Sequence, residues 1–174
     1  KTFLAYSLIS DWLRVPESMK IVVRGELPPG VTAKDLALHV IGALKADAGL
    51  YMSVEWHGEA VRALTIDQRS VLTNMMTEMG VKNSYIPPDQ KVFDYLSGRA
   101  KRSYEPVYPD DDAAYARVVE YDASSMEPMV ACPHAVDNVV PLADVLGRRI
   151  DQAFIGTCAN GRLDDLAAAA LILK

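Results

Sequence analysis

The sequence has little that would tie it to an oxidising compartment, to nucleic acid or to a membrane. Two cysteines, Cys132 and Cys158, are too few for a disulfide framework, so we expect a reducing, cytoplasmic setting without a secretory signal. The net charge of -5 argues against a nucleic-acid partner. The longest apolar run, residues 166–173, is too short to cross a bilayer, so we expect no membrane partner.

What is present is typical of an ordinary globular chain, with 50% apolar and 24% charged residues. Strand-like and helix-like patterns alternate, which favours a layered α/β fold. The patterns predict strands at 19–23, 50–56, 83–86, 118–121 and 128–131, and helices that begin at Thr32, Ile66, Pro88, Asp110 and Leu142. The chain starts without methionine and stops within a helical pattern, as an excised piece would.

The segment around Cys158 is the most informative part of the chain. Phe154 and Ile155 are typical of the end of a buried strand, and residues 163–173 favour a helix. This predicts Cys158 in a strand-to-helix turn, where the helix dipole and free N–H groups stabilise a thiolate. A thiolate there is a nucleophile or a metal ligand; the alternative is a small buried thiol that fills a turn.

The helix predicted from Ile66 to Met79 carries a polar stripe. At about 100° per residue, this stripe contains Asp67, Ser70, Asn74 and Glu78. One interpretation is an amphipathic helix whose stripe faces water. The other is that Asn74 and Glu78 point into a polar cavity, where a carboxamide and a carboxylate position bound water.

Several ordered motifs together resemble the aconitase family. They cover nearly the whole chain and lie at residues 15–20, 27–35, 54–58, 74–78, 133–138 and 154–162. Their spacing is most similar to the large subunits of 3-isopropylmalate dehydratases, which act in leucine biosynthesis. The resemblance implies that residues 1–174 form one three-layer α/β/α domain of an iron–sulfur hydro-lyase, which dehydrates and rehydrates a small hydroxy-acid.

The resemblance also implies roles for individual residues. Cys158 matches the first of three cysteines that hold a [4Fe-4S] cluster with one open iron, and Asn160 matches an asparagine expected to hydrogen-bond near that cluster. Glu78 matches the glutamate beside the open iron, and Asn74 an active-site asparagine. The serine that acts as the base comes, in the family, from a swivelling domain or a small subunit, which is the implied partner.

Parts of the family pattern have no counterpart in this sequence. The later Cys-x-x-Cys, an earlier histidine- and aspartate-rich segment and the substrate-binding arginines are missing, so we expect a fragment of a large subunit that is inactive alone. Homoaconitase, aconitase, a methylmalate-type dehydratase and a non-catalytic excised domain stay open as alternatives. Ala159 and Trp56 replace the usual threonine and Phe or Tyr, and residues 3–10 fit poorly.

The other candidate ligands have simpler interpretations. His39, His57 and His134 show no metal-site spacing and are expected to be structural, with His134 in a turn. Cys132 is expected to be an inert core thiol. Arg162 follows the cysteine segment and is expected to face solvent, as arginines at helix starts commonly do; the alternative is contact with an anionic substrate.

Overall fold

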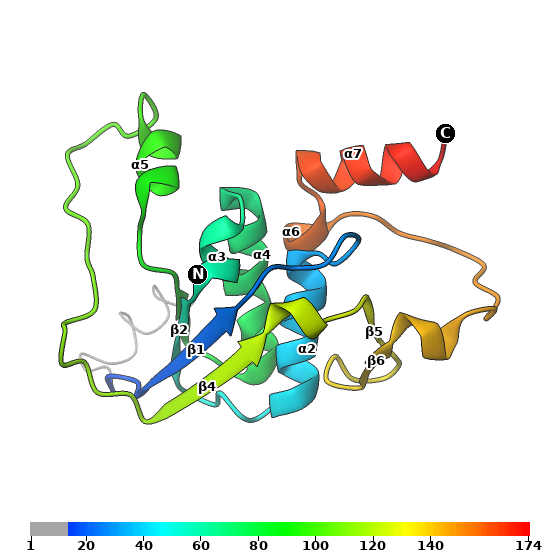
Figure 1. Ribbon diagram of the computed structural model, residues 1–174, viewed down its shortest axis with the longest axis horizontal. Coiled ribbons are helices and arrows are strands. Elements are labelled where there is room, and N and C mark those ends of the chain that lie inside the picture. Colours follow the sequence, from blue (N-terminus) through cyan, green and yellow to red (C-terminus); the bar gives the residue numbers. More distant parts are fainter. Residues whose placement is uncertain (1–13) are drawn as a thin grey trace, which may run out of the picture.

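A parallel four-stranded sheet lies at the centre of the computed structural model, which describes residues 14–174 (Figure 1). The poorly matching segment 3–10 lies outside the described residues. The strand order is β3-β2-β1-β4, and each neighbouring pair is parallel. The strands are β1 (Ser18–Arg24), β2 (Ser53–His57), β3 (Asn83–Tyr85) and β4 (Arg117–Asp122).

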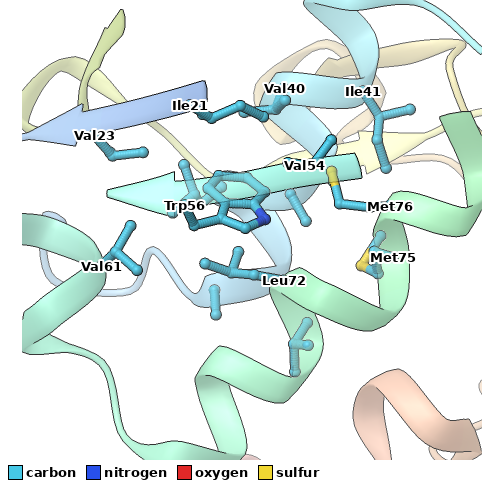
Figure 2. Packing of buried hydrophobic residues seen from close by; sticks show 14 of the residues in the cluster. Ile21, Val23, Val40, Ile41, Val54, Trp56, Val61, Leu72, Met75 and Met76 are labelled. Atoms are coloured by element: carbon cyan, nitrogen blue, oxygen red, sulfur yellow. The ribbon is translucent and has the colours of Figure 1, made fainter. Parts of the chain in front are cut away.

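The core lies on one face of this sheet. Side chains alternate along a strand, and the register pairs Met19 with Val54 and Ile21 with Trp56, so that all four point to the same face and are buried. Helices α2 (Ala33–Leu44) and α4 (Ile66–Met75) cover that face. Figure 2 shows side chains from both helices and both strands packed around the Trp56 ring, with Leu72, Met75 and Met76 from the α4 side.

Helix α4 begins and ends as its sequence predicts. Thr65 is the N-cap, and its hydroxyl and the Gln68 side chain form a reciprocal capping box. The helix continues as the 3-10 turn η1 (Met76–Met79) and stops at Gly80, which has φ of 74°. Glycine accepts this left-handed conformation without steric cost.

A hairpin of β5 (Met129–Ala131) and β6 (Val139–Pro141) lies against helix α2 and is bound near both ends of it. At the start of α2, Asp35 Oδ2 accepts a hydrogen bond from Thr32 N at 2.7 Å, while its Oδ1 accepts one from Met129 N at 2.9 Å. Beyond the end of α2, Ala46 N donates to Asp137 Oδ2 at 3.1 Å. The position of the hairpin is thus set by the ends of the helix.

The other face of the sheet is polar and is partly covered by the irregular segment 97–116. Glu55 Oε2 accepts a hydrogen bond from the Tyr115 hydroxyl at 2.7 Å. The same oxygen lies 3.2 Å from His57 Nε2. Lys20 Nζ lies 5.0 Å from the centre of the Tyr115 ring. Burial, together with the hydrogen bond to Glu55, raises the pKa of Tyr115 to about 12.

The remaining elements are short or lie at the periphery. They are α3 (Glu59–Ala63), α5 (Gln90–Leu96), η2 (Ala123–Ser125), η3 (Leu142–Val145), α6 (Thr157–Asn160) and α7 (Leu163–Ile172). Helix α7 contains no buried residue, and it extends away from the sheet (Figure 1). Within residues 14–174, no helix is both long and apolar enough to span a bilayer.

The α/β fold predicted from the sequence is confirmed, and most elements lie where the patterns place them. The helix predicted from Asp110 is wrong: residues 111–112 form a turn, and the chain then extends into β4. The cause is tertiary, because Ala116 N donates to Ser18 O at 2.9 Å and so draws the segment into the sheet. The predicted strand at 50–56 begins only at Ser53.

Candidate active site

Cys158 lies in the one-turn helix α6, which precedes α7. The strand predicted at Phe154 and Ile155 is wrong, since both residues are irregular and Phe154 is 79% exposed. No neighbouring strand pairs with them in the described part of the chain, and an apolar pair without a partner strand has no ladder to join. The Cys158 thiol is free and exposed, which excludes the alternative of a buried thiol that fills a turn.

The backbone is unusual directly before this cysteine. Thr157 has φ of 73°, a left-handed conformation that is uncommon for a β-branched residue. Its hydroxyl accepts a hydrogen bond from Ala159 N at 3.4 Å. Such strained residues cluster at functional sites, so this observation agrees with a functional use of the Cys158 segment.

A cavity of about 680 Å³ opens beside Cys158 and brings together three of the four candidate residues. Cys158, Asn74 and Glu78 all line it. The other lining residues come from α2, from the end of α4 and η1, from the hairpin and its turn, and from α6: Lys34, Leu38, Met75, Thr77, Met129, Val130, Ala131, Val136, Thr157 and Ala159. One wall is therefore apolar, and the carboxylate, carboxamide and thiol belong to the same cavity.

The polar stripe of α4 meets other parts of the protein along its length. Asp67 Oδ1 lies 3.1 Å from Arg162 Nη1. Asn74 lines the large cavity and also a second cavity of about 430 Å³. Cys158 lines that second cavity too. Glu78 follows on the 3-10 turn, where it is exposed to the large cavity. The stripe thus faces α6 and two cavities rather than bulk water alone.

Asn160, the fourth candidate, is not among the residues that line either cavity. Its Nδ2 donates to Asp165 Oδ1 at 3.1 Å, and its Oδ1 is buried without a hydrogen-bond partner. Asp165 Oδ2 also accepts from Arg162 N at 3.1 Å. Asn160 therefore ties α6 to the first turn of α7.

The other candidate ligands are spread over the molecule. His39 packs edge-on against Tyr121, with the two ring centres 5.5 Å apart. Cys132 is partly exposed rather than buried in the core. Across residues 14–174, no three His, Cys, Asp or Glu side chains come together as a metal site.

This cavity contains one side chain that could be a ligand of an iron–sulfur cluster, namely Cys158. Cluster ligands are thiolates, and Cys158 is the one thiol among the described residues that line the cavity. The cavity volume of about 680 Å³ leaves room for a bound group beside that thiol. Cys132 does not line this cavity, so the other thiolates would have to come from outside the residues that line it.

Sequence reasoning missed Lys34 and the hairpin wall of the cavity. Lys34 lies one position before Asp35, whose two carboxylate oxygens hold the start of α2 and the hairpin together. No local sequence pattern predicts that Lys34 lies near Cys158, which is far away in the sequence. The cap predicted at Thr32 was the one available signal, since it placed Lys34 in the first turn of a helix.

Residues 8–148 of the chain match the aconitase family (aconitate hydratase). The chain belongs to the aconitase family. That match ends before Cys158, but the alignment to the "3-isopropylmalate dehydratase large subunit" of Hydrogenobaculum sp. includes 99% of this chain, at 47% identity and over 41% of that protein. The family assignment predicted from the motifs is therefore confirmed.

Two further relatives are similar over most of the chain. The "Probable methanogen homoaconitase large subunit" of Methanosarcina mazei is 50% identical over 94% of this chain and 42% of that protein. The "3-isopropylmalate dehydratase large subunit 1" of Methanopyrus kandleri is 48% identical over 94% of this chain and 39% of that protein. The chain thus spans about two-fifths of the length of the curated relatives it matches.

Proposed function

We propose that this chain is one α/β domain of the large subunit of a 3-isopropylmalate dehydratase, a [4Fe-4S] hydro-lyase of leucine biosynthesis. The observation that carries the proposal is that Cys158, Asn74 and Glu78 line a single cavity. The names of the Hydrogenobaculum and Methanopyrus relatives support the choice of enzyme. A small subunit is the partner that such a large subunit implies.

The residues of this cavity can bind and orient a hydroxy-acid. Cys158 would supply one thiolate for the cluster, and a bound cluster would provide Lewis-acid chemistry beside these side chains. Glu78 accepts a hydrogen bond from the hydroxyl group that leaves or from the water that returns. Asn74, one turn earlier, donates its amide to a substrate oxygen. A base from the partner removes the neighbouring proton.

The cavity wall suits the two ends of such a substrate. Among the described residues that line it, Lys34 is the one with a cationic side chain, and a cation offsets the repulsion between Glu78 and a substrate carboxylate. Leu38, Met129, Val130 and Val136 form an apolar wall that can contact a branched hydrocarbon group. We infer from this wall that the substrate carries an alkyl substituent.

Anaerobic reconstitution tests the proposal. The chain is combined with the remaining parts of the large subunit and with the small subunit, loaded with iron and sulfide, and assayed for dehydration of isopropylmalate. We expect activity and cluster absorption, both lost in Cys158→Ser and retained in Cys132→Ser. A fully loaded Cys158→Ser enzyme would show that the ligand assignment is wrong. The chain alone is expected to be inactive.

Homoaconitase is the second candidate, favoured by the 50% identity to the Methanosarcina relative. The same reconstituted enzyme separates the two candidates when homocitrate and isopropylmalate are compared at equal concentration. A higher kcat/KM for homocitrate would replace the first proposal by the second. Absence of turnover with every hydroxy-acid, despite a loaded cluster, would favour a non-catalytic domain.

A further inference from the structure

We propose that Asp67 is a positioning residue. Through Arg162, it holds the Cys158 segment, residues 157–161, against helix α4. This inference rests on the proposed function, since it concerns the placement of the cluster thiol. Arg162 Nη1 donates a hydrogen bond to Asp67 Oδ1 at 3.1 Å. Nothing in the family motif, which ends at Arg162, assigns a role to Asp67.

The Cys158 segment has few other attachments to the body of the protein. The connection before it exposes Leu146, Ile150 and Phe154, and helix α7 after it has no buried residue. Within the segment, Ala159 is the residue that packs against the core. Besides the packing of α6 beside α4, one methyl group and one ion pair therefore carry much of its attachment.

The partner of Arg162 lies on the element that bears the other active-site residues. Asp67 is in the first turn of α4, Asn74 is near the end of that helix, and Glu78 follows on η1. A helix is a stiff connection. The ion pair therefore fixes Cys158 relative to Asn74 and Glu78, and its loss should let the thiol move away from them.

The geometry predicts a local effect rather than a global one. The two side chains are 37% and 36% exposed, and exposed ion pairs add little to the stability of a whole protein. Arg162 also donates from its backbone N to Asp165, a bond that substitution of Asp67 leaves in place. Asp67→Asn should therefore loosen residues 157–161 while the melting temperature stays nearly constant.

Hydrogen exchange measured by mass spectrometry on the full chain tests this without need of the cluster. In Asp67→Asn, we expect amides of residues 157–161 to exchange about two- to fivefold faster, as loss of one exposed ion pair allows. Asp164→Asn is the matched control, because it removes a charge from the first turn of α7 without touching Arg162. The charge-reversed double variant Asp67→Arg with Arg162→Asp should restore slow exchange.

In the reconstituted enzyme, Asp67→Asn should also lower the iron content per enzyme, with Asp67→Glu recovering it. Unchanged exchange in Asp67→Asn, or no recovery in the charge-reversed pair, would overturn the role of Asp67. That result is distinct from failure of the proposed function, which would appear as a Cys158→Ser enzyme that keeps its cluster whatever residue stands at position 67.

Discussion

Glu78 and Cys158 line one cavity although they come from distant parts of the chain. The first lies on the 3-10 turn that follows α4, and the second lies in α6. They meet because α6 packs beside α4, and Arg162, which follows α6 and is the N-cap of α7, pairs with Asp67 of α4. This relationship makes the carboxylate and the thiol candidates for one chemical step.

Replacing Glu78 by glutamine should depress turnover while leaving the fold nearly intact. Glu78 is exposed, so its loss removes a charge at the reacting oxygen but no core packing. General acid–base groups typically contribute a factor of about 10² to 10⁴, and we expect kcat to fall within that range. Steady-state kinetics and thermal melting of the reconstituted enzyme measure both effects.

The matched control for that variant is Glu105→Gln, an exposed carboxylate in segment 97–116. It should leave kcat unchanged. Equal turnover in Glu78→Gln and the wild type would remove Glu78 from the mechanism.

Replacing Lys34 by methionine should raise KM for the hydroxy-acid more than it lowers kcat. The amine attracts a substrate carboxylate in both the ground state and the transition state, so its loss weakens uniform binding. A charged hydrogen bond of this kind is worth about 1.5 to 3 kcal/mol, which corresponds to a KM increase of about ten- to a hundredfold. Lys34→Arg should recover part of the affinity.

Lys101→Met, in the exposed segment 97–116, is the control for a change in overall charge. If it raises KM as much as Lys34→Met does, the effect is long-range steering and Lys34 makes no contact with substrate. Measurement at two ionic strengths strengthens the comparison, since screening weakens steering.

Asp35→Ala should destabilise the protein and loosen the hairpin. The carboxylate completes the cap of α2 and accepts the Met129 N–H, and the loss of a helix cap costs about 1 to 2 kcal/mol. Urea unfolding measures that loss, and hydrogen exchange at residues 129–141 reports the hairpin. Asp47→Ala, an exposed acid shortly after α2, should change neither quantity.

The ion pair between the buried Arg69 and the partly exposed Asp89 predicts a specific loss of stability in acid. Asp89 accepts hydrogen bonds from both terminal nitrogens of Arg69, at 2.8 and 2.5 Å. The hydrogen bonds from Arg69 lower the pKa of Asp89 below its usual value. The pair therefore stabilises the fold fully above that usual value, and the stabilisation disappears as the pH falls through the lowered pKa.

Asp89→Asn should consequently cost about 2 kcal/mol at pH 7, and the difference from wild type should shrink below about pH 4, where the unfolded carboxyl takes up its proton. Thermal melts at pH 7 and pH 3 measure this. The control is Asp94→Asn, because Asp94 is exposed and lies in α5, the helix that Asp89 caps. A pH-independent difference would show that the ionised pair is not the cause.

Local patterns predicted most of the helices and strands, and they predicted the part of the site that lies on α4 and η1. The strand at 19–23, the start of a helix at Thr32 and the end of the next helix before Gly80 each depend on neighbours within a few positions, so they can be recognised from the sequence. The stripe with Asn74 and Glu78 was visible for the same reason. The errors at Asp110 and at Phe154 have the opposite cause, since a strand needs a hydrogen-bonded neighbour that only the folded chain supplies or withholds.

The sequence alone determined that this chain is an α/β protein of the aconitase family and predicted which side chains carry its chemistry, because periodicity, caps and motifs are short-range properties. Tertiary structure decided which of those side chains share a cavity. The contacts of Asp35 with Met129 and of Asp67 with Arg162 join segments far apart in the chain. Such pairings depend on how α2, α4 and the sheet pack, and no local pattern encodes them.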